Sequence, residues 1–216
     1  MAIVYEGKYP GEFIDSEANG TRSRDEITIL SGQNVVAGEV LGKVTKGAAT
    51  PAADAGNTAD SGTIASAAVG AGAKVGVYRA TCIEPATDAG KFLVEDPDGI
   101  QVGVATVAVE FVGGGLTFTI TDGTGDFVSG DSFTITVAAG SGKYVAFDQD
   151  GTDGSEVAAA IAYDNYDASA ADVVGVGIVR DAEVNGNELT WPSDIDAGEQ
   201  TAAEAQLEAL GILVRT

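Results

Sequence analysis

Apolar and polar residues alternate strictly in two segments in the middle of the chain. In residues 116–121 and 133–137 large apolar side chains occupy every second position, and threonines occupy most of the positions between them. Because successive side chains of a strand point to opposite faces, each segment is predicted to be a strand with one apolar face. The pattern places six side chains in one core: Leu116, Phe118, Ile120, Phe133, Ile135 and Val137.

The rest of the chain also favours short strands separated by turns that are rich in Gly, Asp and Asn. In the middle of the chain we predict further strands at 74–84, 91–95 and 101–112, with the second alternating segment extending over 132–138. On either side of this middle part, strands are predicted at 27–30, 35–44, 143–147, 157–163 and 172–180. The fold class is therefore mainly β.

Two segments that are far apart in the sequence look like the halves of one β-hairpin. They are residues 40–45 and 143–148, and the strand-rich block 63–142 stands between them. We therefore predict an inserted β-module, barrel-like or sandwich-like, at 63–142, within a discontinuous core formed by 27–62 and 143–216. Residues 46–62 consist almost entirely of Ala, Gly, Asp, Thr and Pro, which predicts a flexible linker or long loop.

The two ends of the chain differ in character. Residues 1–26 show no sustained periodicity, and Pro10 with several glycines opposes a continuous helix, so this segment is predicted to be an extended arm ordered by a partner. Near the other end, residues 201–204 form a capping-box pattern before a short run of helix formers, and Gly211 follows as the expected left-handed cap. One short C-terminal helix is therefore predicted.

Composition excludes several classes of function. The chain has no histidine and one cysteine, Cys82, so Ser–His and Cys–His catalysis, the usual zinc sites and an intrachain disulfide are excluded. A formal charge of −22 repels nucleic-acid backbones. We find no apolar run of membrane-spanning length and no signal peptide, so synthesis and retention in the cytoplasm are expected.

Acidic motifs offer no convincing catalytic or metal site. Residues 148–154 resemble a calcium loop but lack its later bidentate Glu, so a tight turn whose aspartates bond neighbouring amides is favoured. Pairs such as Asp164 and Asp167 arise by chance among 33 acidic residues and have no catalytic frame around them. We expect no enzyme activity, no cofactor and no metal.

Several of these segments carry a resemblance to a known family. Residues 142–148 (GKYVAFD), residues 150–162 (DGTDGSEVAAAIA) and residues 187–192 (NELTWP) together resemble the head decoration protein D family of lambda-like tailed phages. The resemblance covers roughly residues 27–46 and 143–216. The inserted block is similar to a β-module of other phage virion proteins. The long insertion is absent from the shortest family members, so its role cannot be transferred.

The resemblance implies a structural virion protein. Its members form homotrimers on the outside of the expanded phage head, at local three-fold points, and clamp the major capsid protein against the pressure of packaged DNA. We expect the arm to bind the capsid by adding a strand to a sheet edge. The residues expected to act there are Ile3, Val4, Tyr5, Tyr9 and Phe13.

The trimer contact is expected among apolar residues of the family-like region, and the sequence does not separate interface from core there. These residues are Val157, Ile161, Trp191, Pro192, Leu207 and Leu210. The alternative function is a tail or surface adhesion β-module that binds a receptor or a carbohydrate.

Overall fold

The computed structural model describes residues 7–19, 21–58 and 62–216. The chain folds into two compact units, an outer unit of Met1–Thr45 with Gly142–Thr216 and an inserted unit of Lys46–Ser141. About half of the residues lie in strands and 8% in helices, so the prediction of a mainly β fold with one short C-terminal helix is confirmed.

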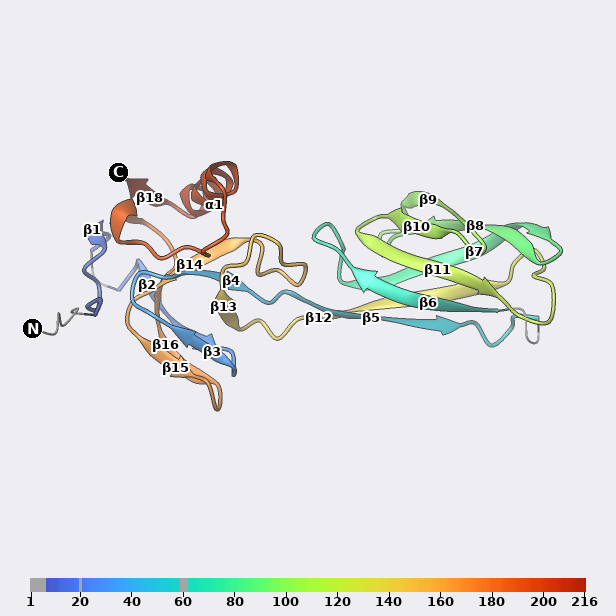
Figure 1. Ribbon diagram of the computed structural model, residues 1–216, viewed down its shortest axis with the longest axis horizontal. Helices are drawn as coiled ribbons and strands as arrows, with labels where there is room; N and C mark the ends of the chain where they lie inside the picture. The colour runs from blue at the N-terminus through green and yellow to red at the C-terminus, as the bar shows by residue number, and fades with distance from the viewer. Residues whose placement is uncertain (1–6, 20, 59–61) are drawn as a thin grey trace, which may run out of the picture. The chain divides into compact units, whose positions relative to one another are not determined.

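The outer unit is built around a small closed barrel with the strand order β13-β2-β16-β14-β4 (Figure 1). A three-stranded sheet, β1-β17-β18, and a two-stranded sheet, β15-β3, complete it. Its strands are β1 (Ile14–Glu17), β2 (Arg24–Ile29), β3 (Gln33–Val35), β4 (Val40–Lys43), β13 (Tyr144–Ala146), β14 (Ala158–Ala162), β15 (Tyr166–Ala168), β16 (Val173–Ile178), β17 (Ala182–Asn185) and β18 (Ile212–Arg215). A 3-10 turn, η1 (Gly186–Glu188), and the helix α1 (Ala197–Ala209) lie between β17 and β18.

The two halves of the split hairpin do pair. β13 runs antiparallel to β4, with Tyr144 opposite Lys43 and Ala146 opposite Leu41. β13 also pairs in parallel with β2, and β4 pairs with β14 on its other edge. The predicted pairing of 40–45 with 143–148 is therefore confirmed, and this β4–β13 pair closes the barrel.

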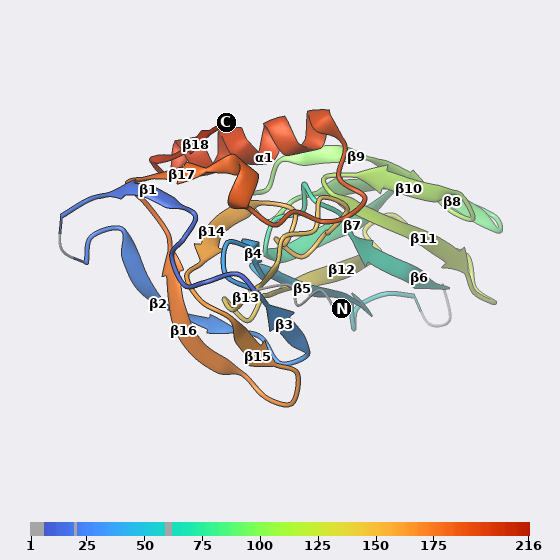
Figure 2. The ribbon, with the colours of Figure 1, turned by 60° about the vertical axis from the view of Figure 1, so that its left-hand side comes forward.

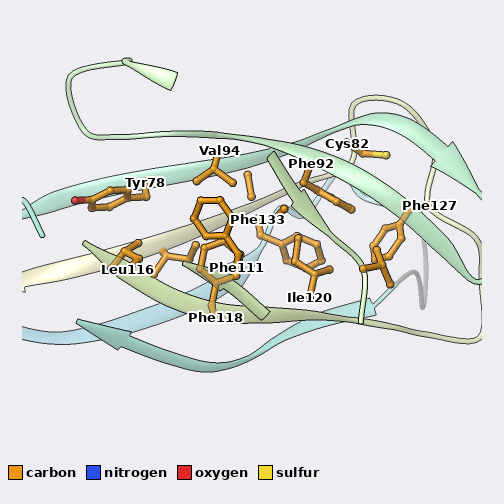
Figure 3. Close-up of a cluster of buried hydrophobic side chains, with 14 of the residues drawn as sticks. Tyr78, Cys82, Phe92, Val94, Phe111, Leu116, Phe118, Ile120, Phe127 and Phe133 are labelled. Carbon is orange, nitrogen blue, oxygen red and sulfur yellow. The ribbon is translucent and has the colours of Figure 1, made fainter. Parts of the chain in front are cut away.

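The inserted unit consists of two sheets, β5-β12-β7-β8-β9 and β10-β11-β6. Its strands are β5 (Lys46–Ala53), β6 (Gly62–Val69), β7 (Gly76–Ala86), β8 (Ala89–Glu95), β9 (Gln101–Thr106), β10 (Glu110–Gly113), β11 (Leu116–Asp122) and β12 (Ser132–Ala139). The six alternating side chains predicted to share a core are all buried in one cluster. Figure 3 shows how aromatic rings fill this cluster, among them Phe92, Phe127 and Phe133. Cys82 is buried at its edge, as predicted.

The prediction of a flexible linker at 46–62 is wrong for its first half. Residues 46–53 form β5, which pairs antiparallel with β12 over a long register that begins at Lys46 opposite Ala139. The segment 101–112 also differs from its prediction, because residues 107–109 separate β9 from β10.

The helix begins five residues earlier than its sequence pattern indicated. Asp196 is the N-cap and forms a capping box with Glu199, while Thr201 lies inside α1 and donates its hydroxyl to the Ala197 carbonyl. Asp196 with Glu199 and Thr201 with Glu204 have the same capping-box spacing, and Asp is preferred over Thr as an N-cap. Gly211 does adopt the predicted left-handed conformation, with φ +80°. Figure 2 shows α1 beside β18.

Close approach of β4 to the segment at Ser155 makes Gly42 a sensitive position. A Cβ at Gly42 would lie 2.3 Å from the Ser155 carbonyl oxygen and 2.6 Å from the Ser155 Cα, both backbone atoms that cannot move independently. We predict that Gly42→Ala destabilises the outer unit by about 1–3 kcal/mol through overpacking. A Cβ at Gly7 would meet no atom within 4 Å, so Gly7→Ala is the matched control. Thermal unfolding of the two variants checks this, and equal melting temperatures would contradict it.

Candidate functional site

A pocket of about 310 Å³ opens in the outer unit beside the Trp-Pro segment. Its lining residues are Glu39, Val40, Ala146, Phe147, Asp148, Thr190, Trp191, Pro192, Ser193 and Asp194. Thr190 forms a parallel bridge with Glu39, donates its backbone N–H to Gly38 and accepts from the Val40 N–H. These bonds fix Trp191 beside the end of β4. We call this site the Trp191 pocket.

Several of the residues that line the Trp191 pocket are apolar. Val40 and Phe147 are buried in the outer core, and Trp191 packs against the same cluster. The rings of Trp191 and Phe147 meet edge to face, with centroids 6.1 Å apart and planes at 87°. The indole N–H is buried and has no hydrogen-bond acceptor among the described residues. The indole ring is therefore held by packing and not by a hydrogen bond of its own.

Acidic residues line the Trp191 pocket as well. Burial raises the pKa of the Glu39 carboxyl above its ordinary value, against the opposing effects of the hydrogen bond from the Val36 N–H and of the Lys8 charge. Lys8 Nζ donates to Thr190 Oγ1 at 2.9 Å and to the Glu188 carbonyl. Asp148 and Asp194 are exposed, and neither forms an ion pair with any described residue.

The aspartate-rich turn at 148–155 positions one of these acids. Asp148 Oδ1 accepts from the Asp150 N–H, and Asp153 Oδ1 accepts from both the backbone N–H and the hydroxyl of Ser155. The prediction that these aspartates bond neighbouring amides in a tight turn is confirmed. Among the described residues we find no group of three or more acidic or cysteine side chains arranged to hold a metal ion.

Comparison with known proteins places the chain in a family. A family model for bacteriophage lambda head decoration protein D matches residues 3–212, nearly the whole chain. The chain belongs to the head decoration protein D family. The family is one of structural proteins associated with the phage capsid, so this member is a β-rich capsid decoration protein of the phage head. The resemblance drawn from the GKYVAFD, DGTDGSEVAAAIA and NELTWP segments is confirmed.

Other comparisons add nothing to this assignment. No curated protein matches the chain. Two crystal structures of FlgL from Xanthomonas campestris match with 20% identity and a TM-score of 0.33. The two alignments cover 48% and 51% of this chain, and 33% of each FlgL chain. Likeness at this level carries no argument about fold or function. Within the described residues, none of the helices has the length and apolar character that crossing a membrane requires.

The residues expected in the trimer contact divide into two groups by burial. Ile161 and Leu207 have no exposed surface and belong to the core of the outer unit. Val157 is 48% exposed and Leu210 is 38% exposed, while Trp191 and Pro192 are half-buried. Ile161 and Leu207 therefore offer no surface to a neighbouring subunit. Sequence patterns could not reveal this, because the buried and the exposed members of the set are equally apolar.

The residues expected in the capsid-binding arm also divide. Ile3, Val4 and Tyr5 lie outside the described residues. Tyr9 is 53% exposed, but Phe13 is 1% exposed and lies in the core of the outer unit. Assigning Phe13 to the arm's contact surface is therefore corrected, because a buried ring offers no surface to a partner. Residues 14–17 form β1, which pairs with β17, so the predicted arm of 1–26 is too long.

Sequence reasoning found Trp191 and Pro192 but missed the acidic residues around them. Glu39, Asp148 and Asp194 come from three segments that only the tertiary fold brings together. Local signals explained each of them separately, as a strand residue, a turn residue and a residue before the helix. No sequence spacing connects them.

Substitutions at Trp191 separate its packing from its polar group. We predict that Trp191→Ala costs about 2–4 kcal/mol, because it removes the contact with Phe147 and part of the outer core. Trp191→Phe should cost clearly less, since it keeps a ring and removes a buried donor that has no acceptor. Denaturant unfolding measures both free energies. Equal losses for the two variants would contradict this, because they would mean that a phenyl ring recovers none of the indole's packing.

Proposed function

We propose that this protein binds the outside of the expanded phage head as a homotrimer at local three-fold sites. Its partner there is the major capsid protein, and the trimers stabilise the shell against the pressure of packaged DNA. The match of the decoration protein D family to residues 3–212 is the observation that carries this proposal. The protein is made in the host cytoplasm and acts in the virion.

The charge of the chain supports an outer position. Its 33 acidic residues against 11 basic ones repel the phosphates of packaged DNA, so nucleic acid is not its ligand. Such a charge also keeps a protein soluble and free of self-association through non-specific contacts. A specific trimer contact must then come from local apolar surface.

We assign the trimer contact to the apolar side chains that remain exposed on the outer unit. Val157 precedes β14 and Leu210 is the C-cap residue of α1. The Gln206 side chain of α1 accepts from the Ala158 N–H, so the helix and the start of β14 are held beside each other. Val157 and Leu210 therefore belong to one region of the surface, which is suited to burial against a second copy.

The arm provides the second part of binding. Its attachment point is fixed, because the Gly11 N–H donates to the Tyr163 carbonyl and Phe13 is buried in the outer core. Residues before this point, above all Ile3, Val4 and Tyr5, would add a strand to an exposed sheet edge of the capsid, where backbone bonds supply affinity. Three arms on one trimer can raise the affinity by roughly 10²–10⁴ through avidity.

Removing the arm without its attachment point tests the proposal. We predict that deletion of residues 2–6 leaves folding and trimer formation intact but weakens decoration of expanded heads by at least tenfold. A deletion that reached residue 14 would also remove Phe13 from the core and confound folding with binding. Sedimentation measures the trimer, and electron microscopy of protein mixed with expanded heads measures decoration.

Undiminished decoration by the shortened trimer would refute the role of the arm. Absence of decoration by the full-length protein would refute the proposed function as a whole. Binding to cells or glycans in place of heads would point instead to an adhesion module.

A further inference from the structure

The Trp191 pocket combines two properties that are rarely found together on a surface that serves only solubility. Four apolar residues line it, Val40, Phe147, Trp191 and Pro192, and two of them are aromatic. Three acidic residues, Glu39, Asp148 and Asp194, line it as well, and no basic residue of the described part of the chain does. At about 310 Å³ it has the size of the smallest ligand pockets, which begin near 300 Å³, and suits one long side chain better than a polymer.

These properties complement one kind of side chain. Arginine has an aliphatic stem that packs on apolar surface and a planar guanidinium that stacks on aromatic rings and pairs with carboxylates. A cation over an indole contributes about 0.5–2 kcal/mol, and more when it is removed from water. Lysine offers the charge and the stem but not the planar group. An acidic or uncharged polar side chain would meet repulsion from the carboxylates or leave them uncompensated.

The cation already present near the pocket does not fill this role. Lys8 Nζ bonds Thr190 Oγ1 and the Glu188 carbonyl, and its charge acts on Glu39. Asp148 and Asp194 remain without an ion pair among the described residues. The bond from Lys8 to Thr190 places Lys8, where the arm joins the outer unit, beside the pocket, so a partner that engages the arm also comes close to the pocket.

We propose that the Trp191 pocket receives an arginine side chain of the major capsid protein, whose stem packs against Trp191 and whose guanidinium pairs with Asp148 and Asp194. This inference rests on the proposed function and specifies the chemistry of its partner. It assigns Trp191 and Pro192 to capsid docking, whereas Val157 and Leu210 serve the trimer. The pocket and the arm then form one continuous capsid-facing contact.

Trp191 is the one tryptophan of the chain, so its indole signal reports on this pocket alone. The first experiment titrates the folded protein with N-acetyl-arginine amide and follows the indole N–H resonance by NMR. We expect a saturable shift, which should be absent with the uncharged isostere N-acetyl-citrulline amide. The double variant Asp148→Asn with Asp194→Asn should reduce the apparent affinity at least fivefold. The amide oxygen that this variant carries at position 148 can still accept from the Asp150 N–H, so the turn is kept.

A matched control removes two negative charges, as the pocket variant does, but elsewhere on the outer unit. Glu26 and Glu208 are exposed and line no part of the pocket, so Glu26→Gln with Glu208→Gln should leave the titration unchanged. An equal loss of affinity in both double variants would overturn the proposal in favour of a general charge effect. An equal shift with N-acetyl-lysine amide would overturn the choice of arginine.

The second experiment uses undecorated expanded heads from the phage that encodes the protein. We expect the Asp148→Asn/Asp194→Asn variant to bind about tenfold more weakly than wild type, and the Glu26→Gln/Glu208→Gln control to bind like wild type at the same salt concentration. If wild type decorates heads and the pocket variant does so equally well, the pocket inference fails while the proposed function stands. If wild type does not decorate heads at all, it is the proposed function that fails.

Discussion

The antiparallel ladder between β4 and β13 is the constraint on which the structure depends. It joins two segments separated by the whole inserted unit and closes the barrel, because β4 also pairs with β14 and β13 with β2. At the end of this ladder the Gly142 N–H donates to the Val44 carbonyl and the Val44 N–H donates to the Lys143 carbonyl. These bonds bring together the two points at which the chain enters and leaves the inserted unit. An insertion here costs little loop-closure entropy, because β5 and β12 pair immediately beyond and hold the same two ends.

The same ladder organises the candidate site. β4 supplies Val40, and Glu39, the residue before it, bridges Thr190. β13 ends at Ala146, and Phe147 and Asp148 follow it, so both strands contribute to the Trp191 pocket. The family assignment identifies the protein as a capsid decoration protein, and our proposal for the pocket adds a chemistry to that role. The net charge disfavours contact with DNA, exposed Val157 and Leu210 suit self-association, and the acidic, aromatic pocket suits a basic side chain. The proposed roles use different parts of one small unit.

Sequence patterns succeeded where short-range physics decides the outcome. Period-two alternation identified the core of the inserted unit through residues such as Phe118 and Ile135, because pleat geometry leaves no other way to bury one apolar face. Turn chemistry identified the aspartate bonds at 148–155 and the left-handed Gly211. Patterns failed where two local solutions compete or where composition is uninformative. The helix used Asp196 as its cap in place of Thr201, and β5 formed from small residues because a neighbouring strand was available.

By itself, the sequence determined the fold class, the split of one hairpin by an insertion, the family and the exclusion of His-dependent catalysis, and its net charge disfavours nucleic-acid binding. Each of these depends on local periodicity, turn residues or total charge. The tertiary structure alone decided that Phe13 belongs to the core, that Ile161 and Leu207 are buried while Val157 and Leu210 are exposed, and that Glu39, Asp148 and Asp194 surround Trp191. Burial and the meeting of distant side chains depend on long-range packing, which no local pattern along a chain encodes.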